Sequence, residues 1–503
     1  MASTESPNPK MEKTQLEDTE RQNGQAPASN SVEDLSDEHR QYLMDRHGHL
    51  ALEPVPSMDP ADPYNWPRST RQKKIINLVL VAFHAMMGTF TAAAIQSAFV
   101  DIAQDFDIEV QKASYLTSLV IAILGGAPLF WRPLSNIYGR RPIFLISLIC
   151  SLAGNIGCGF SYSYGTMALC RAITAFFISP AAAIGSAVVQ EMFFKTERAT
   201  FMGAWTIMVT LGVPIAPFIF GFVALRVNYR WIYYVLAITN AVQFVLYLFL
   251  GPETLYRRDF AVKPSSPKLK KQYFTFRRIN PDPLSWKDFV HPFIYFTKPV
   301  VWIPAMSYSM IFLWSNIMPT IEIPQIFPAK YGFNTQQVGL QFLSFILGAI
   351  IGEQMGGRMS DLWMNHRRKQ TGSPPPAEHR LWLSYIGQTF AIVGVIVFLV
   401  QTAATETYNI TPLVGTTIGA VGNQLVTTVY ITYAVDCYRE DAAGVGVFIT
   451  FVRQIWGFIG PFWFPQLIEA AGMPGTAGVA TGMMVVFAVL PTLYLQFRGR
   501  SLH

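Results

Sequence analysis

Residues 113–161 hold two apolar blocks, ASYLTSLVIAILGGAPLFWRPLS (113–135) and PIFLISLICSLAGNIGCGFS (142–161), with the basic loop NIYGRR (136–141) between them. An α-helix needs about 20 mostly apolar residues to cross the ~30 Å hydrocarbon core of a bilayer. Each block has that length, and a helix pairs its backbone polar groups internally, as lipid requires. The stretch therefore predicts two membrane-spanning helices joined by a short polar turn.

Blocks of this kind recur along the whole chain of 503 residues. Hydrophobic residues make up 51% of it and charged residues only 14%, against roughly a quarter charged in a soluble protein. The predicted spans cover residues 75–97, 113–135, 142–161, 165–190, 200–225 and 230–250, and then 299–325, 337–359, 380–402, 410–436, 443–468 and 476–497. The pattern predicts an all-α polytopic membrane protein with twelve transmembrane helices in two six-helix bundles.

The polar stretches between these spans divide the chain. We expect a disordered N-terminal tail over residues 1–70, with a short helix near Tyr42–Met44. A first bundle (71–251), a central loop (252–298) and a second bundle (299–497) follow, and residues 498–503 form a short C-terminal end. The first residues are polar and acidic without an apolar signal-peptide core, so the first span is expected to serve as its own insertion signal. The basic central loop is interpreted as a linker lying against anionic lipid. Its alternative, carried by Ser265-Ser266-Pro267, is control by phosphorylation.

The distribution of Lys and Arg predicts the orientation of the helices. With the N-terminus inside, almost all basic residues of the loops and flanks fall on the cytoplasmic side; the exceptions are Lys112, Arg226, Arg230 and Lys330. Cytoplasmic loops carry an excess of Lys and Arg, so both termini are expected in the cytoplasm. The sequon at Asn409 then lies in an outer loop and is a candidate glycosylation site. We expect the plasma membrane as the location, with an organelle membrane as the alternative.

Several other classes of protein are disfavoured. The pI near 9.0 does not indicate nucleic-acid binding, because the basic residues are spread over short loops and do not form a stripe. The four cysteines lie in or beside apolar blocks without metal-ligand spacing, which favours buried packing; they are Cys150, Cys158, Cys170 and Cys437. No HExxH, GxSxG or phosphate-binding Gly-Lys motif occurs. We therefore expect no enzyme activity, no metal and no cofactor.

The two halves of the chain echo each other. Leu134–Arg141 after the second span is matched by Met359-Ser360-Asp361 and a basic run after the eighth. Ala216-Pro217 in span five is matched by Gly460-Pro461 in span eleven. Repeats related by an axis along the membrane normal place a substrate site between the halves, near the bilayer midplane.

The loop between spans two and three resembles a signature of the major facilitator superfamily, and the chain is most similar to the fungal drug:proton antiporters with twelve spans. The family signature, Gly-x-Leu-(Ala/Ser)-Asp-(Arg/Lys)-x-Gly-Arg-Arg, is matched at Leu134, Ser135, Gly139, Arg140 and Arg141, and is not matched at Arg132, Asn136 and Ile137. Gly139 permits a tight turn, and an arginine pair can bind carboxylates and helix C-termini. The resemblance implies a latch for one conformation, with Asp361 as counterpart in the second half. Plain anchoring at a basic face is the alternative.

Arg171 in span four is the second resemblance. An arginine inside a span costs about 2.5 kcal/mol or more and normally faces a partner or an aqueous cavity. The resemblance links this residue to proton coupling. Its alternative is a side chain that snorkels to the outer surface.

Span five carries the third resemblance. Its residues Gly203, Gly212, Pro217 and Gly221 fall in register with the family's exporter signature, Ala216 and Phe220 replace two of its glycines, and Pro214 adds a second helix breaker. Small residues allow helices to approach closely, and proline bends a helix. Because uptake symporters of the family lack this signature, the resemblance implies an exporter.

Other polar residues inside the spans are candidates without a motif. Spans one, four, seven and ten line the cavity of this fold, and the candidate substrate contacts on them are Gln96, Gln190, Trp314, Asn316, Asn423 and Gln424. Besides Arg171, the candidates for proton coupling are His84, Glu322, Glu353 and Arg453. His84 is alternatively a packed core histidine. Arg453 is expected to need a carboxylate partner, Glu353 or Asp361, in an ion pair that is structural or functional.

The resemblance thus implies a monomeric secondary active transporter in the lipid bilayer, which exports small organic compounds such as drugs, toxins or secondary metabolites in exchange for protons. One alternative is an uptake symporter for a sugar, organic acid or similar nutrient. Pro252-Glu253-Thr254 with Arg257 and Arg258 favours it, because this sequence resembles one that follows span six of sugar porters. The other alternative is a membrane sensor that does not transport, which would be expected to carry a longer cytoplasmic tail.

Overall fold

The computed structural model describes residues 35–50, 52–59, 62–66, 71–256, 278–281, 283–372, 376–438 and 441–499. Over these ranges the chain forms helices and no strand. The predicted phosphorylation segment Ser265-Ser266-Pro267 lies outside the described residues, as do residues 1–34 and 500–503.

The first half contains the six predicted spans as helices, two of them broken into shorter pieces. These are α3 (Arg71–Ala93) with η4 (Gln96–Ala98) and α4 (Phe99–Asp105), α5 (Val110–Tyr138), α6 (Arg140–Gly159), α7 (Tyr164–Ile178) with α8 (Pro180–Met192), α9 (Lys195–Arg226) and α10 (Arg230–Leu250). The break in the fourth span falls at Pro180, since proline supplies no N–H for the helix ladder.

The second half begins after the short helices α12 (Trp286–Val290) and η5 (His291–Thr297). Its helices are α13 (Pro299–Phe312), η6 (Leu313–Ile317) and α14 (Met318–Tyr331); α15 (Thr335–Gln341), α16 (Leu343–Gln354), η7 (Met355–Met359) and α17 (Ser360–Thr371); η8 (Ala377–Leu381) and α18 (Trp382–Ala404); α19 (Thr411–Cys437); α20 (Ala442–Ile459) and η10 (Gly460–Phe462); and α21 (Phe464–Met484), η11 (Val485–Val489) and α22 (Leu490–Arg498). The elements η6, η7 and η11 are single π-helical turns.

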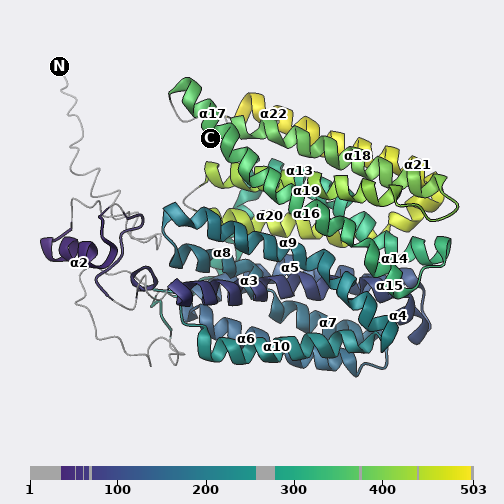
Figure 1. Ribbon diagram of the computed structural model, residues 1–503, viewed down its shortest axis with the longest axis horizontal. Coiled ribbons are helices and arrows are strands. Elements are labelled where there is room, and N and C mark those ends of the chain that lie inside the picture. Colours follow the sequence, from purple (N-terminus) through teal and green to yellow (C-terminus); the bar gives the residue numbers. More distant parts are fainter. Residues whose placement is uncertain are drawn as a thin grey trace, which may run out of the picture.

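The long helices lie side by side and run between two ends of the molecule (Figure 1). We call the end at which α3 and α9 begin, on the left in Figure 1, the terminal end. The opposite end, where α4, α14 and α15 lie, is the far end.

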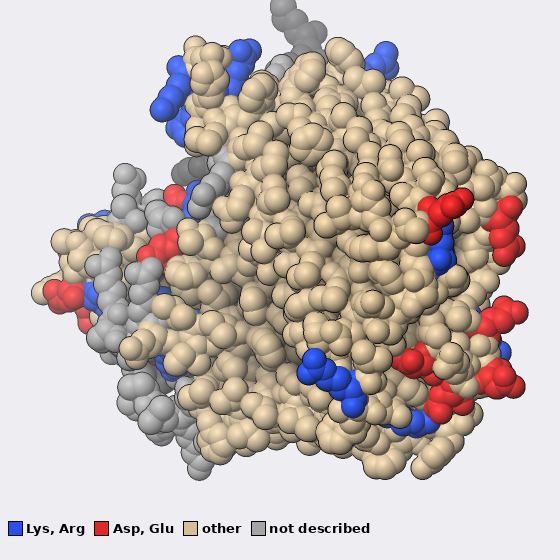
Figure 2. Space-filling model, turned by 45° about the vertical axis from the view of Figure 1, so that its right-hand side comes forward, with Lys and Arg blue, Asp and Glu red and all other residues tan. Residues whose placement is uncertain are grey.

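Eleven helical stretches in the described part of the chain are long and apolar enough to cross a membrane. The twelfth span is α19, whose 27 residues extend about 40 Å at 1.5 Å per residue. Its polar side chains lower its hydropathy, and several of them, including Thr416, Asn423 and Gln424, are buried in the protein. Figure 2 shows a wide uncharged surface, with charged side chains gathered toward the ends of the molecule. The chain is therefore a multi-pass membrane protein with twelve spanning helices, as predicted.

The short helix expected near Tyr42–Met44 in the N-terminal polar stretch is present as α2 (Asp37–His47), which contains the fully buried Leu43. Further along, the hydroxyl of Tyr64 donates a hydrogen bond to the backbone carbonyl of Gln190 in α8. The described part of the stretch thus folds against the terminal end, because its few apolar side chains find partners there.

The connection between the last two spans also differs in detail from the prediction. Helical residues continue through most of the predicted loop 469–475, and α21 is broken at Gly472, where φ is +69°. Glycine adopts this left-handed conformation without a steric penalty. A single residue therefore makes the break that the sequence assigned to a seven-residue loop.

The most extensive packing between the halves involves α5 and α9 of the first half. Helix α5 of the first half packs along α20 of the second, and α9 packs against α15 and α16. The polar and charged groups described next lie on these helices or directly behind them.

Candidate functional site

The turn between α5 and α6 is held by charged groups of the first half. Gly139 has a φ of +99°, and a Cβ there would lie 2.4 Å from a carboxylate oxygen of Glu253, so only glycine fits. The Arg140 guanidinium forms an ion pair with Glu191 at 2.8 Å and donates to the side chain of Asn136, also at 2.8 Å. Asn136, which replaces the family's aspartate, thus remains a partner of the arginine.

Arg141 and Glu253 connect the ends of two helices reciprocally. The Arg141 guanidinium donates to the carbonyls of Tyr247 and Leu248 at 2.9 and 2.8 Å, at the C-terminal end of α10. The Glu253 carboxylate accepts the backbone N–H groups of Arg140 and Arg141 at 2.8 and 3.0 Å, at the N-terminus of α6. Each charge lies where the helix dipole favours it. The arginine pair therefore fastens helices within the first half.

The contact between the halves at the terminal end is made by Arg132, a residue at which the sequence departs from the family signature. Its guanidinium lies 2.8 Å from the carboxylate of Asp441, at the start of α20. The Tyr295 hydroxyl donates to the same carboxylate at 2.8 Å, and the Asp441 side chain also accepts the Gly444 N–H. Burial, together with the Asp441 carboxylate, raises the pKa of Tyr295, so the hydroxyl stays protonated and acts as the donor.

At the far end, α9 and α15 meet through glycines. A Cβ on Gly221 would lie 3.1 Å from the Cα of Gly339, and a Cβ on Gly339 would lie 2.6 Å from the carbonyl oxygen of Pro217. Nearby, the Thr335 hydroxyl donates to Asp101 at 2.8 Å, linking α15 with α4. The halves are thus in close contact at this end as well.

The remaining residues of the span-five pattern differ in their surroundings. A Cβ on Gly212 would lie 2.2 Å from the Thr89 hydroxyl, so α9 and α3 approach closely there. Pro214 and Pro217 lie inside α9, between this contact and the one at Gly221. Gly203 has open space beside it. The pattern therefore spans one tight contact within the first half and one between the halves.

Arg171 is buried in the first half, which excludes outward snorkelling in this conformation; its residue is 2% exposed. The guanidinium donates to the carbonyls of Thr91 and Ala92 at 3.4 and 3.3 Å, and to that of Leu116 at 3.2 Å. The Tyr233 hydroxyl is 3.5 Å away. Thr91 and Ala92 end α3, where a cation is favourable. Arg171 therefore joins α7 to the end of α3 and to α5.

His84 does not face the space between the halves. Its side chain is fully buried, its Nε2 lies 3.0 Å from the Ser147 hydroxyl, and its ring packs against Phe144 and Tyr247. These partners belong to α6 and α10, on the inside of the first half. The geometry favours the packed core histidine over the coupling residue, because its ring contacts side chains of the first half, Ser147, Phe144 and Tyr247.

The two candidate carboxylates lie in the second half. Glu322 in α14 is 2% exposed, and its closest polar partner is the Gln325 amide at 3.5 Å. Glu353 in α16 is half-buried and accepts a hydrogen bond from Gln424 of α19. Both are therefore ionisable groups inside spans, where such groups are rare and usually functional.

The expected ion pair of Arg453 with Glu353 is wrong. Arg453 donates to the Tyr308 hydroxyl at 2.8 Å, and its guanidinium lies 4.7 Å from the centre of the Phe312 ring. Glu353 is instead bound to Gln424. The side chain of Asp361, the other expected partner, lies outside the described residues.

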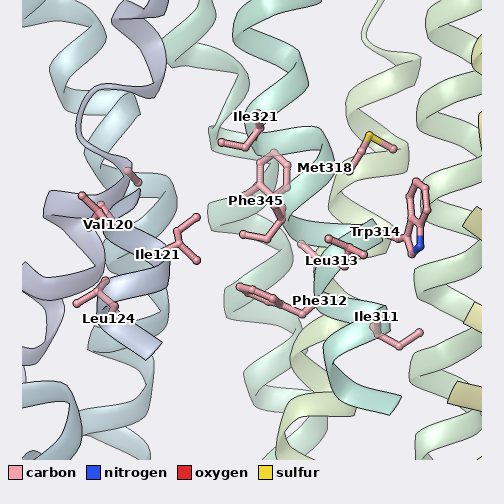
Figure 3. Close-up of a cluster of buried hydrophobic side chains, with 14 of the residues drawn as sticks. Val120, Ile121, Leu124, Ile311, Phe312, Leu313, Trp314, Met318, Ile321 and Phe345 are labelled. Atoms are coloured by element: carbon pink, nitrogen blue, oxygen red, sulfur yellow. The ribbon is translucent and has the colours of Figure 1, made fainter. Parts of the chain in front are cut away.

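Trp314 points into the second half, not toward the first. It lies on the π-helical turn η6, is fully buried and packs against Trp463 and Phe464 with ring centres 5.3 and 5.5 Å apart. Figure 3 shows it on the side away from α5, whereas Phe312 points toward α5. The extra residue of a π-turn rotates the following helix, which is common at functional sites. Asn316, on the same π-turn, is half-exposed.

The other predicted substrate contacts and the glycosylation candidate Asn409 are scattered. Gln190 is exposed and lies two residues before the end of α8, at the terminal end and not at the midplane. Gln96 is buried in η4, close to the far end. Asn423 is buried, and its side-chain oxygen has no hydrogen-bond partner. Asn409 is exposed in the connection before α19. The structure does not bring these residues together into one site.

A comparison with known protein families finds one that matches most of this chain. A family model described as Major Facilitator Superfamily matches residues 78–461, most of both halves. The chain belongs to the major facilitator superfamily. It is therefore a multi-pass membrane transporter, as the sequence resemblance implied.

Similar curated proteins include fungal efflux pumps. The efflux pump vrtL of Penicillium aethiopicum is 28% identical over 456 residues, which cover 88% of each chain. The efflux pump radE of Floropilus chiversii is 24% identical and covers 87% of this chain and 82% of its own. Among solved structures, a bacterial homologue of the human lysosomal transporter Spinster, inward-facing and unoccupied, has a TM-score of 0.57 at 15% identity, over 86% of this chain and 98% of that one. This last similarity concerns the fold alone.

Sequence reasoning missed three charged residues of this facilitator. Arg132 was noted only as a departure from the family signature, and Asp441 was not singled out. Glu253 was considered only as part of a sugar-porter resemblance. The sequence does contain a signal for the ion pair. Span two ends with a basic residue, an acidic residue precedes span eleven, and these two helices are neighbours in the fold.

Proposed function

We propose that this protein exports small organic compounds, such as drugs, toxins or secondary metabolites, in exchange for protons. The observation that carries the proposal is the geometry of α9. Its two prolines lie between a tight contact with α3 at Gly212 and a tight contact with the second half at Gly221. Prolines weaken a helix and allow it to bend, and small residues at both contacts allow close approach, so α9 is suited to motion between the halves. The printed names of vrtL and radE as efflux pumps also support export.

In this proposal the two bundles, 71–251 and 299–497, tilt against each other around a site between them. The terminal end faces the cytoplasm of a cell bounded by the plasma membrane, because most basic loop residues lie there. The protein acts as a monomer, and the exposed Asn409 is its glycosylation site. The two intramembrane carboxylates, Glu322 and Glu353, carry the coupled proton, because acids inside spanning helices such as α14 and α16 are rare and usually functional.

The test of export and of coupling uses the purified full chain in proteoliposomes with a pH-sensitive dye inside. Adding a compound released by overexpressing cells is expected to start proton movement in the opposite direction. Glu322→Gln and Glu353→Gln are each expected to leave exchange of labelled for unlabelled compound intact, and at least one of them is expected to abolish accumulation driven by a pH gradient. Proton flux that ignores the compound would disprove antiport, and accumulation of the compound in overexpressing cells would indicate uptake instead.

A further inference from the structure

Arg453 is a cation inside α20 that has no acidic partner among the described side chains. Its recorded contacts are one hydrogen bond to the Tyr308 hydroxyl at 2.8 Å and two aromatic rings, those of Phe312 and Tyr308, at 4.7 and 5.6 Å from the guanidinium carbon. Its Nε is buried and has no hydrogen-bond partner. A guanidinium carries five N–H donors, so most of this donor set is unused.

The side chain lies on a polar face of α20. Gly446, Thr450, Arg453 and Gly457 are spaced four, three and four residues apart, which places them on one side of a helix. The first three are half-exposed, and a Cβ on Gly446 would meet no atom within 4 Å. The opposite side of α20 carries the larger apolar side chain of Ile455. This side therefore borders open space at Gly446 and is closed by packing at Gly457.

This face lies at the junction of the two halves. A Cβ on Gly457 would lie 3.2 Å from the Phe312 ring and 3.3 Å from the side chain of Ile121 in α5. Figure 3 shows Phe312 projecting from the second half toward Ile121 and Leu124 of the first. Because Arg453 stacks on Phe312, its guanidinium is close to the boundary at which the halves must separate during transport.

An arginine inside a span is costly, and such a residue normally faces a partner or a water-filled cavity. A carboxylate would neutralise the charge and accept two parallel N–H bonds from the planar fork.

We propose that Arg453 binds the carboxylate of the transported compound, so that small organic acids form the substrate class of this exporter. The inference rests on the proposed export function. Tyr308 fixes the guanidinium through its hydroxyl, and Phe312 covers one face of it. The polar side of α20 receives the acid, and the half-exposed Asn316 on the π-turn lies one helical turn beyond Phe312.

The experiment measures binding to the full chain with matched acid and amide probes, 1-naphthoate and 1-naphthamide, which differ in charge and little in shape. Isothermal titration is expected to give the wild type an affinity for the acid about tenfold or more above that for the amide, since a hydrogen bond to a charged group contributes about 1.5–3 kcal/mol. Arg453→Gln is expected to bind both equally. Arg453→Lys keeps the charge without the fork and is expected to lose a large part of the preference. Tyr308→Phe removes the hydroxyl that fixes the guanidinium and is expected to lose a smaller part of the preference than Arg453→Gln.

Two results would overturn the inference. The first is a wild type that binds the amide as well as the acid or that does not bind the acid. The second is an unchanged acid preference in Arg453→Gln, or in Arg453→Lys should the glutamine variant not fold. Export of neutral compounds by overexpressing cells, unaffected by these variants, would leave the proposed function standing while removing the acid specificity. A wild type that moves neither acidic nor neutral compounds would instead contradict the proposed function itself.

Discussion

Arg132 in α5 and Asp441 at the start of α20 form an ion pair at 2.8 Å that joins the two halves at the terminal end. Both side chains are partly exposed, at 22% and 26%, and exposed pairs contribute about 0.2–1 kcal/mol. In a two-state equilibrium, about 1 kcal/mol is nonetheless enough to change the ratio of the states about fivefold. The pair therefore favours the conformation in which the terminal ends of α5 and α20 touch.

We predict that Arg132→Gln and Asp441→Asn each raise the fraction of molecules with separated terminal ends about fivefold or less. Spin labels at the terminal ends of α5 and α20 would measure it by pulsed electron resonance. The exchanged pair, Arg132→Asp with Asp441→Arg, is expected to restore part of the closed fraction. Distance distributions that are the same in all four proteins would contradict a role for the pair in the conformational equilibrium.

The glycine contact between α9 and α15 leads to a second prediction. Alanine at Gly221 places a methyl group 2.9 Å from the Thr335 carbonyl oxygen and 3.1 Å from the Gly339 Cα. Both neighbours are backbone atoms and cannot rotate away. Overpacking typically costs about 1–3 kcal/mol. We expect Gly221→Ala to open the far end or to lower the thermal unfolding midpoint. Gly203→Ala on the same helix, where a Cβ meets no atom within 4 Å, is the matched control, and equal effects of the two would refute the contact.

The third prediction concerns the capping carboxylate of the first half. Glu253 accepts four backbone N–H groups, those of Arg140, Arg141, Thr254 and Leu255, at 2.8 to 3.0 Å. Glu253→Gln turns an amide N–H₂ toward donors and leaves some of them without a partner, which costs about 1–3 kcal/mol. We expect a lower thermal unfolding midpoint for this variant. Glu109→Gln, an exposed carboxyl before α5, is expected to leave the midpoint unchanged. A midpoint equal in both variants would contradict the capping role.

The sequence predicted the architecture well because the bilayer imposes a strict rule. Each span must be a helix of about 20 apolar residues, and the twelve blocks obey it. Even α19, whose Asn423 and Gln424 lower its hydropathy, was recognised from its length and position. The ends of the last spans were less predictable, because a single glycine at position 472 was sufficient to break the helix.

The arrangement of side chains was harder to predict because direction around a helix is set by neighbours. His84 and Trp314 lie on spans that line a cavity in this family, yet His84 turns toward Phe144 and Trp314 toward Trp463. The π-turn that rotates Trp314 leaves no clear trace in the sequence. Likewise, Arg453 finds Tyr308 in place of the expected acid, because an aromatic residue one helix away is not visible from spacing along the chain.

Arg171 provides the last prediction. Its guanidinium donates to three backbone carbonyls on α3 and α5 and contacts the Tyr233 hydroxyl. Methionine at this position would leave those carbonyls with fewer donors at the end of α3, at a cost of about 1–3 kcal/mol. The single ammonium of lysine cannot match the planar fork that reaches both helices. We therefore expect the thermal unfolding midpoint to fall in the order wild type, Arg171→Lys, Arg171→Met, with Tyr233→Phe close to the wild type.

The family resemblance also implies a role of Arg171 in proton coupling. In that case the folded Arg171→Lys protein is expected to show reduced pH-driven accumulation of the compound, measured at a temperature well below its unfolding midpoint. A lysine variant with wild-type accumulation at that temperature would restrict Arg171 to fastening α7, α3 and α5 together.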